Sequence, residues 1–456
     1  MSYFSELTYL TASILFIFGL KALSHPDTAR RGMNLAAFGM LLAIIGTLVR
    51  HEIIRYDWII AGLILGSLIG AAMAIWMPMT AMPERTALSH AFGALAATLV
   101  GVSEYYRHGA ELGTFTMTAL GFEVMFGGIT VTGSMMAFAK LSDLVRGTPI
   151  TYKGQNIFNI SLFVLTAAIF VYLVFVPSAS WLFYLMVGFA FLFGVLLVLP
   201  IGAADMPVVM SLMNSYAGLA SAATGFAISN NVLIIAGTLD GFSGFILSIL
   251  MCKAMNRSIN NVLFGAFGAV SASSASQAEG EMREVNAEDV AIQMAYARQV
   301  IFVPGYGLAT AQAQHVVREL GDLLESRGVT VKYAIHPVAG RMPGHMNVLL
   351  AEADVPYSSL YELEQINPDF PSTDVAIVIG ANDVVNPDAR DNPQSPIAGM
   401  PILEVDKARF VIVLKRGKGK GFSGLENPLF FKPNTGMLYG DAKLSLATLA
   451  HAVQQA

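Results

Sequence analysis

The sequence predicts a membrane-embedded bundle of about nine helices, followed by a soluble α/β domain of the Rossmann type with a parallel sheet. Of the 456 residues, 55% are hydrophobic and only 13% are charged, an apolar share too large for an ordinary soluble protein. Apolar runs long enough to cross a bilayer fill most of the first 254 residues. Residues 261–456 carry 15 of the 27 basic and 21 of the 32 acidic residues, so the second part is the soluble one.

Each predicted span contains roughly 20 mainly apolar residues, the length that crosses the hydrocarbon core. The nine spans are 5–22, 33–50, 57–77, 85–105, 116–141, 157–176, 180–199, 207–228 and 231–254. The first span has no basic segment before it and no small-residue cleavage site after it. We therefore expect it to remain in the mature protein as a membrane helix.

Basic residues between the spans predict the orientation in the membrane. Nine of them fall on the side of the C-terminal part: Lys21, Arg30, Arg31, Arg85, Lys140, Arg146, Lys153, Lys253 and Arg257. Three fall on the other side: Arg50, Arg55 and Arg107. These positions place the C-terminal domain in the cytoplasm, or in the equivalent compartment of an organelle, and the N-terminus outside. We expect the membrane to be a bacterial cytoplasmic (inner) membrane.

A change in composition predicts the domain boundary. From about Gly265 to Asp289 the chain becomes rich in alanine and serine and then acidic, as is typical of a solvated connection. We assign 1–262 to a transmembrane domain, 263–290 to a linker and 291–456 to a soluble domain.

Charge and cysteine content exclude some classes of function. Acidic residues outnumber basic ones by 21 to 15 in the second part, which argues against a nucleic-acid partner. The single cysteine, Cys252, excludes an intramolecular disulfide and a thiolate metal cluster, so no metal site is expected.

The soluble part alternates short β-rich runs with helical segments. The predicted strands are 299–304, 329–336, 375–380 and 410–414. Because segments long enough for crossover helices separate them, we expect a parallel sheet.

A glycine turn follows the first of these strands. Gly305, Tyr306 and Gly307 stand between a strand and a helix, the context of a dinucleotide-binding fingerprint. There Gly305 permits the tight turn, and Gly307 lets backbone N–H groups approach a pyrophosphate at the helix N-terminus. Position 310 is threonine where the fingerprint has glycine or alanine, and a glycine turn is also ordinary α/β architecture.

Two further features bear on the choice of nucleotide. An NAD site usually has an acidic residue after the second strand, but here that strand leads through His336 to Arg341 without one. The strand at 410–414 runs into Lys415, Arg416 and a glycine- and lysine-rich loop, which suits a 2′-phosphate. The pattern favours NADP(H) over NAD(H), with a solvated charged loop as the alternative.

The turn after the strand at 375–380 is also polar. Asn382 and Asp383 either meet ribose or nicotinamide amide groups or simply form a stable turn.

Polar residues inside the predicted spans are costly and often mark a pathway. His90, Ser134 and Asn214 each lie about 9 to 11 Å inside a span from the cytoplasmic side, at 1.5 Å per residue. Taken singly, each is explained by an ordinary buried hydrogen bond. Taken together they favour a proton site, because His90 titrates near neutrality. Asp205 lies on the loop that enters the eighth span.

Several segments carry a specific resemblance. They are 305–309 with 311–314, 335–352, 380–387 and 427–431 in the soluble part, and 202–209 and 251–257 in the membrane part. Along essentially its whole length the chain resembles the beta subunits of proton-translocating NAD(P) transhydrogenases. The resemblance implies that NADP(H) binds to this chain, reversed relative to ordinary Rossmann enzymes, and that an alpha subunit carries NAD(H).

The resemblance also implies roles for individual residues. The cofactor-site residues are Gly305, Tyr306, Gly307, Val338, Ala339, Gly340, Arg341, Met342, Gly380, Ala381, Asn382, Asp383, Lys415 and Arg416. The loop after Arg416 would act as a lid, although Lys418, Lys420 and Phe422 depart from the family pattern there. His90, Ser134 and Asn214 would line the proton route, and Asp205 would contribute to coupling.

The expected reaction is direct hydride transfer between NAD(H) on the partner and NADP(H) on this chain. Proton passage would drive NADPH formation, and the native particle would be a lipid-embedded dimer of alpha–beta units. Two alternatives remain, an ion transporter gated by a cytoplasmic nucleotide-binding domain and a membrane-tethered NADP dehydrogenase. The first needs ion ligands in broken helices at mid-membrane, and the second needs a substrate domain.

Overall fold

The computed structural model describes residues 2–49, 56–147, 149–202, 205–256, 258–259, 262, 281–395, 397–417 and 425–456. The basic residues Arg50, Arg55 and Arg257, the linker as far as residue 280, and Lys418, Lys420 and Phe422 lie outside the described residues.

The chain divides into two compact units. The first unit comprises Met1–Pro78, Glu84–Ile201 and Val209–Ser248, and the second comprises Met79–Pro83, Gly202–Val208 and Ile249–Ala456.

Nine long α-helices are described before residue 255, at the positions of the nine predicted spans. They are α1 (Ser2–Leu23), α2 (Pro26–Leu48), α3 (Asp57–Trp76), α4 (Met82–His108), α5 (Thr114–Leu141), α6 (Gln155–Phe175), α7 (Ser180–Val198), α8 (Met206–Ala227) and α9 (Asn231–Ala254). Eight of these described helices are long and apolar enough to cross a membrane, and α8 is not among the eight. Most side chains at 209–225 of α8 are buried by protein, so this helix needs less apolar surface than one that faces lipid.

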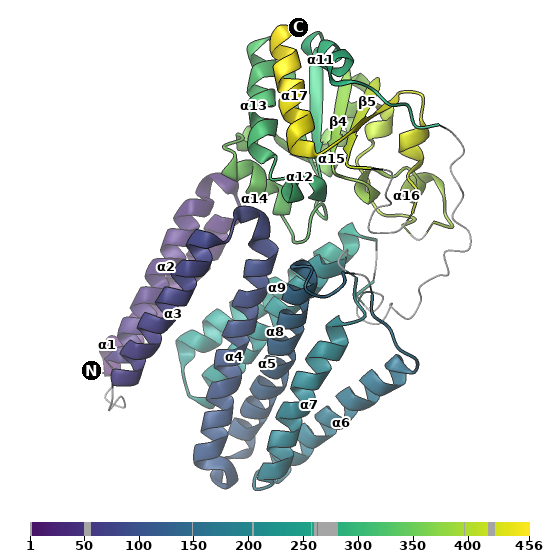
Figure 1. Ribbon diagram of the computed structural model, residues 1–456. Helices are drawn as coiled ribbons and strands as arrows, with labels where there is room; N and C mark the ends of the chain where they lie inside the picture. Colours follow the sequence, from purple (N-terminus) through teal and green to yellow (C-terminus); the bar gives the residue numbers. More distant parts are fainter. Residues whose placement is uncertain are drawn as a thin grey trace. The chain divides into compact units, whose positions relative to one another are not determined.

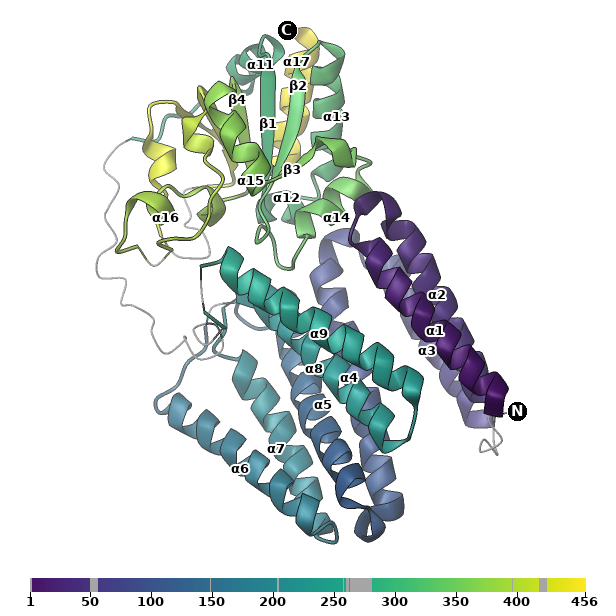
Figure 2. The same ribbon diagram turned by 180° about the vertical axis from the view of Figure 1, so that it is seen from behind.

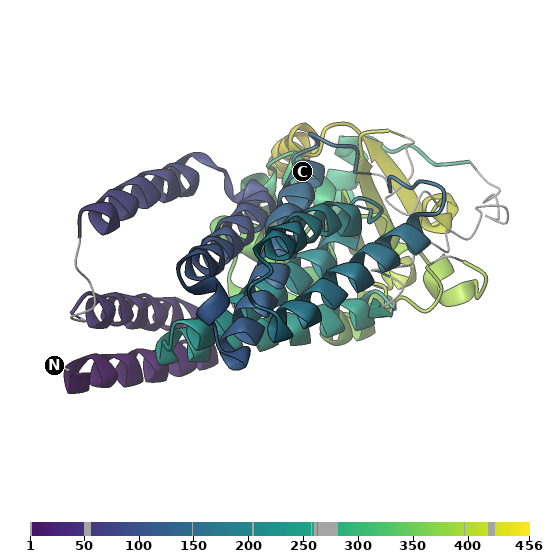
Figure 3. The same cartoon turned by 90° about the horizontal axis from the view of Figure 1, so that it is seen from below.

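The helices of the first unit differ in how much protein surrounds them. α1 and α2 lie side by side, and α5, α6 and α7 pack against one another (Figures 1 and 3). α3 has no buried residue. The polar side chains of interest come from α4, α5, α8 and α9, of which α5 and α8 are the most buried.

The second unit contains a six-stranded sheet in which every pair of neighbours is parallel. Its strands are β1 (Gln299–Pro304), β2 (Thr330–Ile335), β3 (Leu360–Glu362), β4 (Val375–Ile379), β5 (Phe410–Lys415) and β6 (Thr435–Tyr439). Their order is β3-β2-β1-β4-β5-β6, that of the doubly wound dinucleotide-binding fold (Figure 2). The predicted parallel Rossmann-like domain is confirmed.

Helical layers cover both faces of this sheet. On one face pack α11 (Ala287–Ala295), α12 (Tyr306–Thr310), α13 (Gln314–Ser326), α14 (His345–Glu352) and α17 (Ala442–Gln455). On the other lie shorter elements, among them α15 (Leu363–Ile366), with α16 (Asp388–Asp391) beyond it (Figure 1). Because both faces are covered, β4 reads as the continuous apolar run Val-Ala-Ile-Val-Ile, with every residue buried.

The four predicted strands match β1, β2, β4 and β5 within one residue at each end. The sequence did not predict the two edge strands. β3 has only three residues, none of them buried, and β6 contains a glycine. Their strand conformation depends on pairing with β2 and β5.

The folded domain also begins earlier than the predicted boundary at residue 291. Glu284 forms a parallel bridge with Met437 of β6, and Val290 and Met294 of α11 are fully buried. Residues 281–290, assigned to the linker from their composition, therefore belong to the domain.

Candidate functional site

The predicted nucleotide residues gather at the carboxyl edge of the sheet. Gly305 follows β1, His336 follows β2, Gly380 follows β4, and Lys415 ends β5. β1 and β4 are neighbours from which the chain winds outward in opposite directions, which is where ligands bind in open α/β sheets.

The glycine turns after β1 and β4 pack backbone against backbone. A Cβ on Gly305 would lie 2.5 Å from the Ala381 backbone, and one on Gly307 would lie 2.6 Å from Gly380 Cα. Gly380 has φ +64°, and its Cβ would overlap the Gly307 backbone. The N–H of Gly305 donates to Ile379 O at 2.9 Å and that of Gly307 to Gly380 O at 3.0 Å. These glycines therefore allow the close approach of the two turns, and the N–H groups of Gly305 and Gly307 are bonded within this packing.

His336 anchors the loop that follows β2. Its side chain is 1% exposed, with Nδ1 accepting from Val338 N–H at 3.2 Å and Nε2 bonded to Pro401 O at 2.8 Å. Burial lowers the pKa of His336 to about 4, although the Pro401 carbonyl opposes the shift. The neutral ring with its proton on Nε2 satisfies both contacts, so His336 holds the start of the predicted 338–342 loop.

The rest of this loop is shaped by Gly340 and His345. Gly340 has φ +103°, and a Cβ there would lie 2.5 Å from His345 Nδ1, the atom that accepts from Arg341 N–H. The Arg341 guanidinium lies over the Tyr306 ring, 4.2 Å from its centroid. Loop and first glycine turn are thus joined by a cation–π contact. Ala339 is buried, and Val338 and Met342 are partly exposed.

The turn after β4 is held by a residue far away in the chain. Asn427 is 1% exposed and donates to both Asn382 O at 3.0 Å and Asn382 Oδ1 at 3.1 Å. Its own Oδ1 accepts from Leu429 N–H. Ala381 is buried, while Asn382 and Asp383 remain partly exposed at the edge. No local pattern identifies Asn427 as a site residue, because its partner is 45 positions away.

Lys415 and Arg416 end β5 beside this turn. The Lys415 Nζ lies 4.4 Å from the Phe430 ring centroid, and the Lys415 ammonium interacts with the Asp383 carboxylate. Burial lowers the pKa of Lys415, and Asp383 opposes that shift. Arg416 is exposed. The edge therefore presents cationic groups next to a polar turn, with no carboxylate directly after β2, a donor set that fits a phosphorylated ribose better than a free 2′-hydroxyl.

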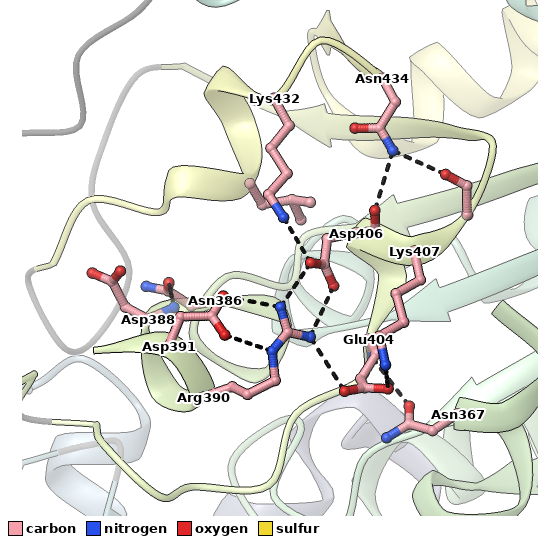
Figure 4. Close-up of polar contacts among 12 residues, drawn as sticks. Asn367, Asn386, Asp388, Arg390, Asp391, Glu404, Asp406, Lys407, Lys432 and Asn434 are labelled. Atoms are coloured by element: carbon pink, nitrogen blue, oxygen red, sulfur yellow. Dashed lines mark hydrogen bonds and ion pairs between the residues drawn. The ribbon is translucent and has the colours of Figure 1, made fainter. Parts of the chain in front are cut away.

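A charge network braces the segments that surround the turn after β4 (Figure 4). Arg390 of α16 bonds to Asp391, Glu404 and Asp406, at 2.8, 3.2 and 2.9 Å respectively. Lys432 joins Asp406 at 2.7 Å. Burial alone would raise the pKa of Asp406, but Arg390 and Lys432 outweigh it, so the pKa lies below its usual value.

Arg390 also lines a cavity of about 600 Å³. Its walls include Asn367, Pro393, Met400 and Glu404. The predicted nucleotide residues are not among the residues that line it, so we do not assign the nucleotide to it.

Within the first unit, two of the three predicted proton-route residues lie together. The His90 ring of α4 is within hydrogen-bonding reach of the Asn214 amide of α8. Asn214 Nδ2 also donates to Asp240 Oδ1 of α9 at 3.2 Å. The close approach of α8 and α9 requires Gly244, since a Cβ there would lie 2.8 Å from Asn214 Nδ2. Asp240, an intramembrane acid for which the sequence predicted no role, is thus part of the cluster.

Ser134 and Asp205 belong to other elements than His90. Ser134 of α5 is fully buried, and its hydroxyl has no hydrogen-bond partner among the described residues. Asp205 directly precedes α8, and its N–H donates to Gly202 O.

Comparison with known proteins decides the family. The family model described as NAD(P) transhydrogenase beta subunit matches residues 5–452. The chain belongs to this family. Two curated relatives named NAD(P) transhydrogenase subunit beta, both from Rhodospirillum rubrum, are each 47% identical over 457 aligned positions that cover 98% of both chains. As a family member the chain is one subunit of a transhydrogenase, an enzyme whose substrates are nicotinamide nucleotides and whose beta subunit works with an alpha subunit.

Proposed function

We propose that this transhydrogenase subunit holds NADP(H) at the carboxyl edge of its sheet. The observation that carries the proposal is the set of groups after β2 and β5. A neutral, buried His336 stands where an NAD site has an acid, and Lys415 and Arg416 stand at the end of β5. A 2′-phosphate gains charge-assisted hydrogen bonds from such cations.

The other parts of the site orient the nucleotide. The 305–307 and 380–383 turns pack together at the carboxyl ends of β1 and β4, and the Arg341–Tyr306 contact joins the 338–342 loop to the first of them. When both nucleotides are bound, hydride passes directly between their nicotinamide rings. The chain therefore supplies position and electrostatics, with no side-chain acid or base needed for the transfer.

NAD(H) is bound by the alpha subunit in this proposal, because the chain has one dinucleotide fingerprint. The native particle is a dimer of alpha–beta units in the cytoplasmic membrane of a bacterium. The nucleotide domain lies in the cytoplasm and the N-terminus outside, in line with the positions of the basic residues.

Proton passage uses the first unit. His90, Ser134 and Asn214 line the route, and the contact between His90 and Asn214 supports this assignment. Protonation of His90 shifts the second unit between a state that exchanges NADP(H) and one that permits hydride transfer, with Asp205 contributing to coupling. Inward proton flow then drives NADPH formation.

Nucleotide choice is tested with Arg416→Ala in the reconstituted alpha–beta complex. We expect NADPH to bind more weakly by about 1 to 3 kcal/mol, or roughly 5- to 150-fold in Kd, with NADH binding unchanged. Arg409→Ala is the matched control, because Arg409 is 63% exposed at the opposite end of the same strand. Equal NADPH affinity in the Arg416 variant and the control would reject the 2′-phosphate role.

The proton role is tested with His90→Asn in membrane vesicles. We expect that, in this variant, hydride transfer from NADPH to an NAD⁺ analogue no longer acidifies the vesicle lumen. A variant that still acidifies the lumen with the wild-type number of protons per hydride contradicts the assignment of His90.

A further inference from the structure

Glu123, in the middle of α5, is a buried acid without a role in the proposal above. Its side chain is 0% exposed, and neither carboxyl oxygen makes a hydrogen bond of normal geometry with a described residue, although the Thr224 hydroxyl and the Gly101 backbone lie within hydrogen-bonding reach. The carboxyl lies against α4, where a Cβ on Gly101 would come within 3.1 Å of Glu123 Oε1. Glu104 of α4 and Thr224 of α8 also face it, and neither brings a positive charge.

The register of α4 against α5 relates Glu123 to the predicted proton route. These helices are antiparallel neighbours: Gly101 meets Glu123, and Thr98 meets Gly127. Continued along both helices, this register sets His90 level with Ser134. Each helix advances 11 residues between the two levels, close to three full turns, so the four positions share one seam. At 1.5 Å per residue the levels are about 16 Å apart.

Polar groups occupy the seam between those levels. The Thr98 and Thr130 side chains are buried, and each hydroxyl donates to a carbonyl of its own helix, at 2.8 and 2.7 Å. Each hydroxyl oxygen can still accept a hydrogen bond. Beyond Gly101, at the end of α4, Glu104 pairs with the half-exposed His108 at 2.9 Å. Titratable or hydroxyl groups therefore recur along the seam from His108 to His90.

No cation described beside Glu123 balances this fully buried carboxyl. A buried acid that only stabilises a helix bundle is normally paired with an opposite charge, because an unpaired charge in an apolar interior is costly. Acidic residues kept inside membrane helices usually mark an ion or proton pathway.

We propose that Glu123 is a second proton-carrying site of the enzyme, on the α4–α5 seam that also holds His90 and Ser134. A proton enters at the end of α4 that carries Glu104 and His108 and is held as an O–H bond on Glu123. That bond breaks as the proton passes to water between the helices, and an N–H bond forms on His90 at the far end of the seam. No electron transfer accompanies these steps. The inference rests on the proton route proposed above.

The test is Glu123→Gln in proteoliposomes that contain the complete alpha–beta complex. We expect at least a tenfold loss of proton pumping and of multiple-turnover hydride transfer. The rate of a single hydride transfer between nucleotides bound beforehand should stay within twofold of wild type, because this step requires no proton to cross the membrane. Glu123→Asp should restore pumping with a shifted pH profile. Glu6→Gln, which removes an exposed carboxyl from α1, is the matched control.

If the Glu123→Gln enzyme pumps protons at the wild-type rate and with the wild-type proton-to-hydride ratio, the inference is overturned. The proposed proton role of His90 is not affected by that result. A wild-type complex that transfers hydride without moving protons would instead overturn the proposed function. Infrared difference spectra of wild type across a pH titration should contain a C=O stretch of a buried carboxylic acid that Glu123→Gln lacks. If wild type and Glu123→Gln both show this C=O band, the inference is also rejected, and this reading holds even if the variant assembles poorly.

Discussion

The contact between the glycine turns after β1 and β4 yields a quantitative prediction. Gly380→Ala places a methyl group where φ is +64° and where it overlaps the Gly307 backbone. The left-handed conformation costs alanine about 1 to 2 kcal/mol. Overlap with rigid backbone typically adds about 1 to 3 kcal/mol. We therefore expect a loss of about 2 to 5 kcal/mol in the stability of the nucleotide domain, together with weaker NADPH binding as the turns separate.

Gly328→Ala separates these two contributions. Gly328 follows α13 with φ +86°, and a Cβ there meets nothing within 4 Å. Gly328→Ala should therefore lower the stability of the domain only by the cost of the left-handed conformation, about 1 to 2 kcal/mol, and should leave NADPH affinity unchanged. The measurement is hydrogen exchange by mass spectrometry on the full chain in detergent, in peptides from β1 and β4, with NADPH titration alongside. A Gly380 variant no less stable than the Gly328 variant would refute backbone packing as the reason for glycine at the turn.

Three other expectations concern the groups that hold the site. The pKa of His336 is lowered to about 4 from 6.5, so its contribution to stability is complete above pH 6.5 and is lost towards pH 4. Exchange in the 336–342 loop, corrected for intrinsic rates, should thus rise across that window in wild type and less in His336→Gln. Asp406→Asn should cost about 1 to 3 kcal/mol and expose the 388–392 and 428–432 segments to exchange. Asp322→Asn, which breaks an exposed pair on α13, should cost less than about 0.5 kcal/mol. Asn427→Ala should weaken NADPH binding roughly 5- to 100-fold in titrations by freeing Asn382, and unchanged affinity would show that this tether does not shape the site.

The features that could be predicted from the sequence alone are those that depend on local composition. Nine helices occur where apolar runs predict them, and four strands occur where β-rich runs predict them, because both signals come from adjacent residues. The glycine turn, the missing acid after β2 and the cations after β5 could likewise be read from neighbours in the chain.

Features that join distant segments could be assigned only once the folded chain was seen in three dimensions. The pairing of β3 and β6 at the sheet edges, the hold of Asn427 on Asn382, and the chain from His90 through Asn214 to Asp240 depend on contacts between elements far apart in sequence. The same holds for the packing of the glycine turns: the Gly307 backbone lies against Gly380, a contact that the sequence did not predict. Such contacts leave no local periodicity or spacing, because they form only when the helices and strands come together.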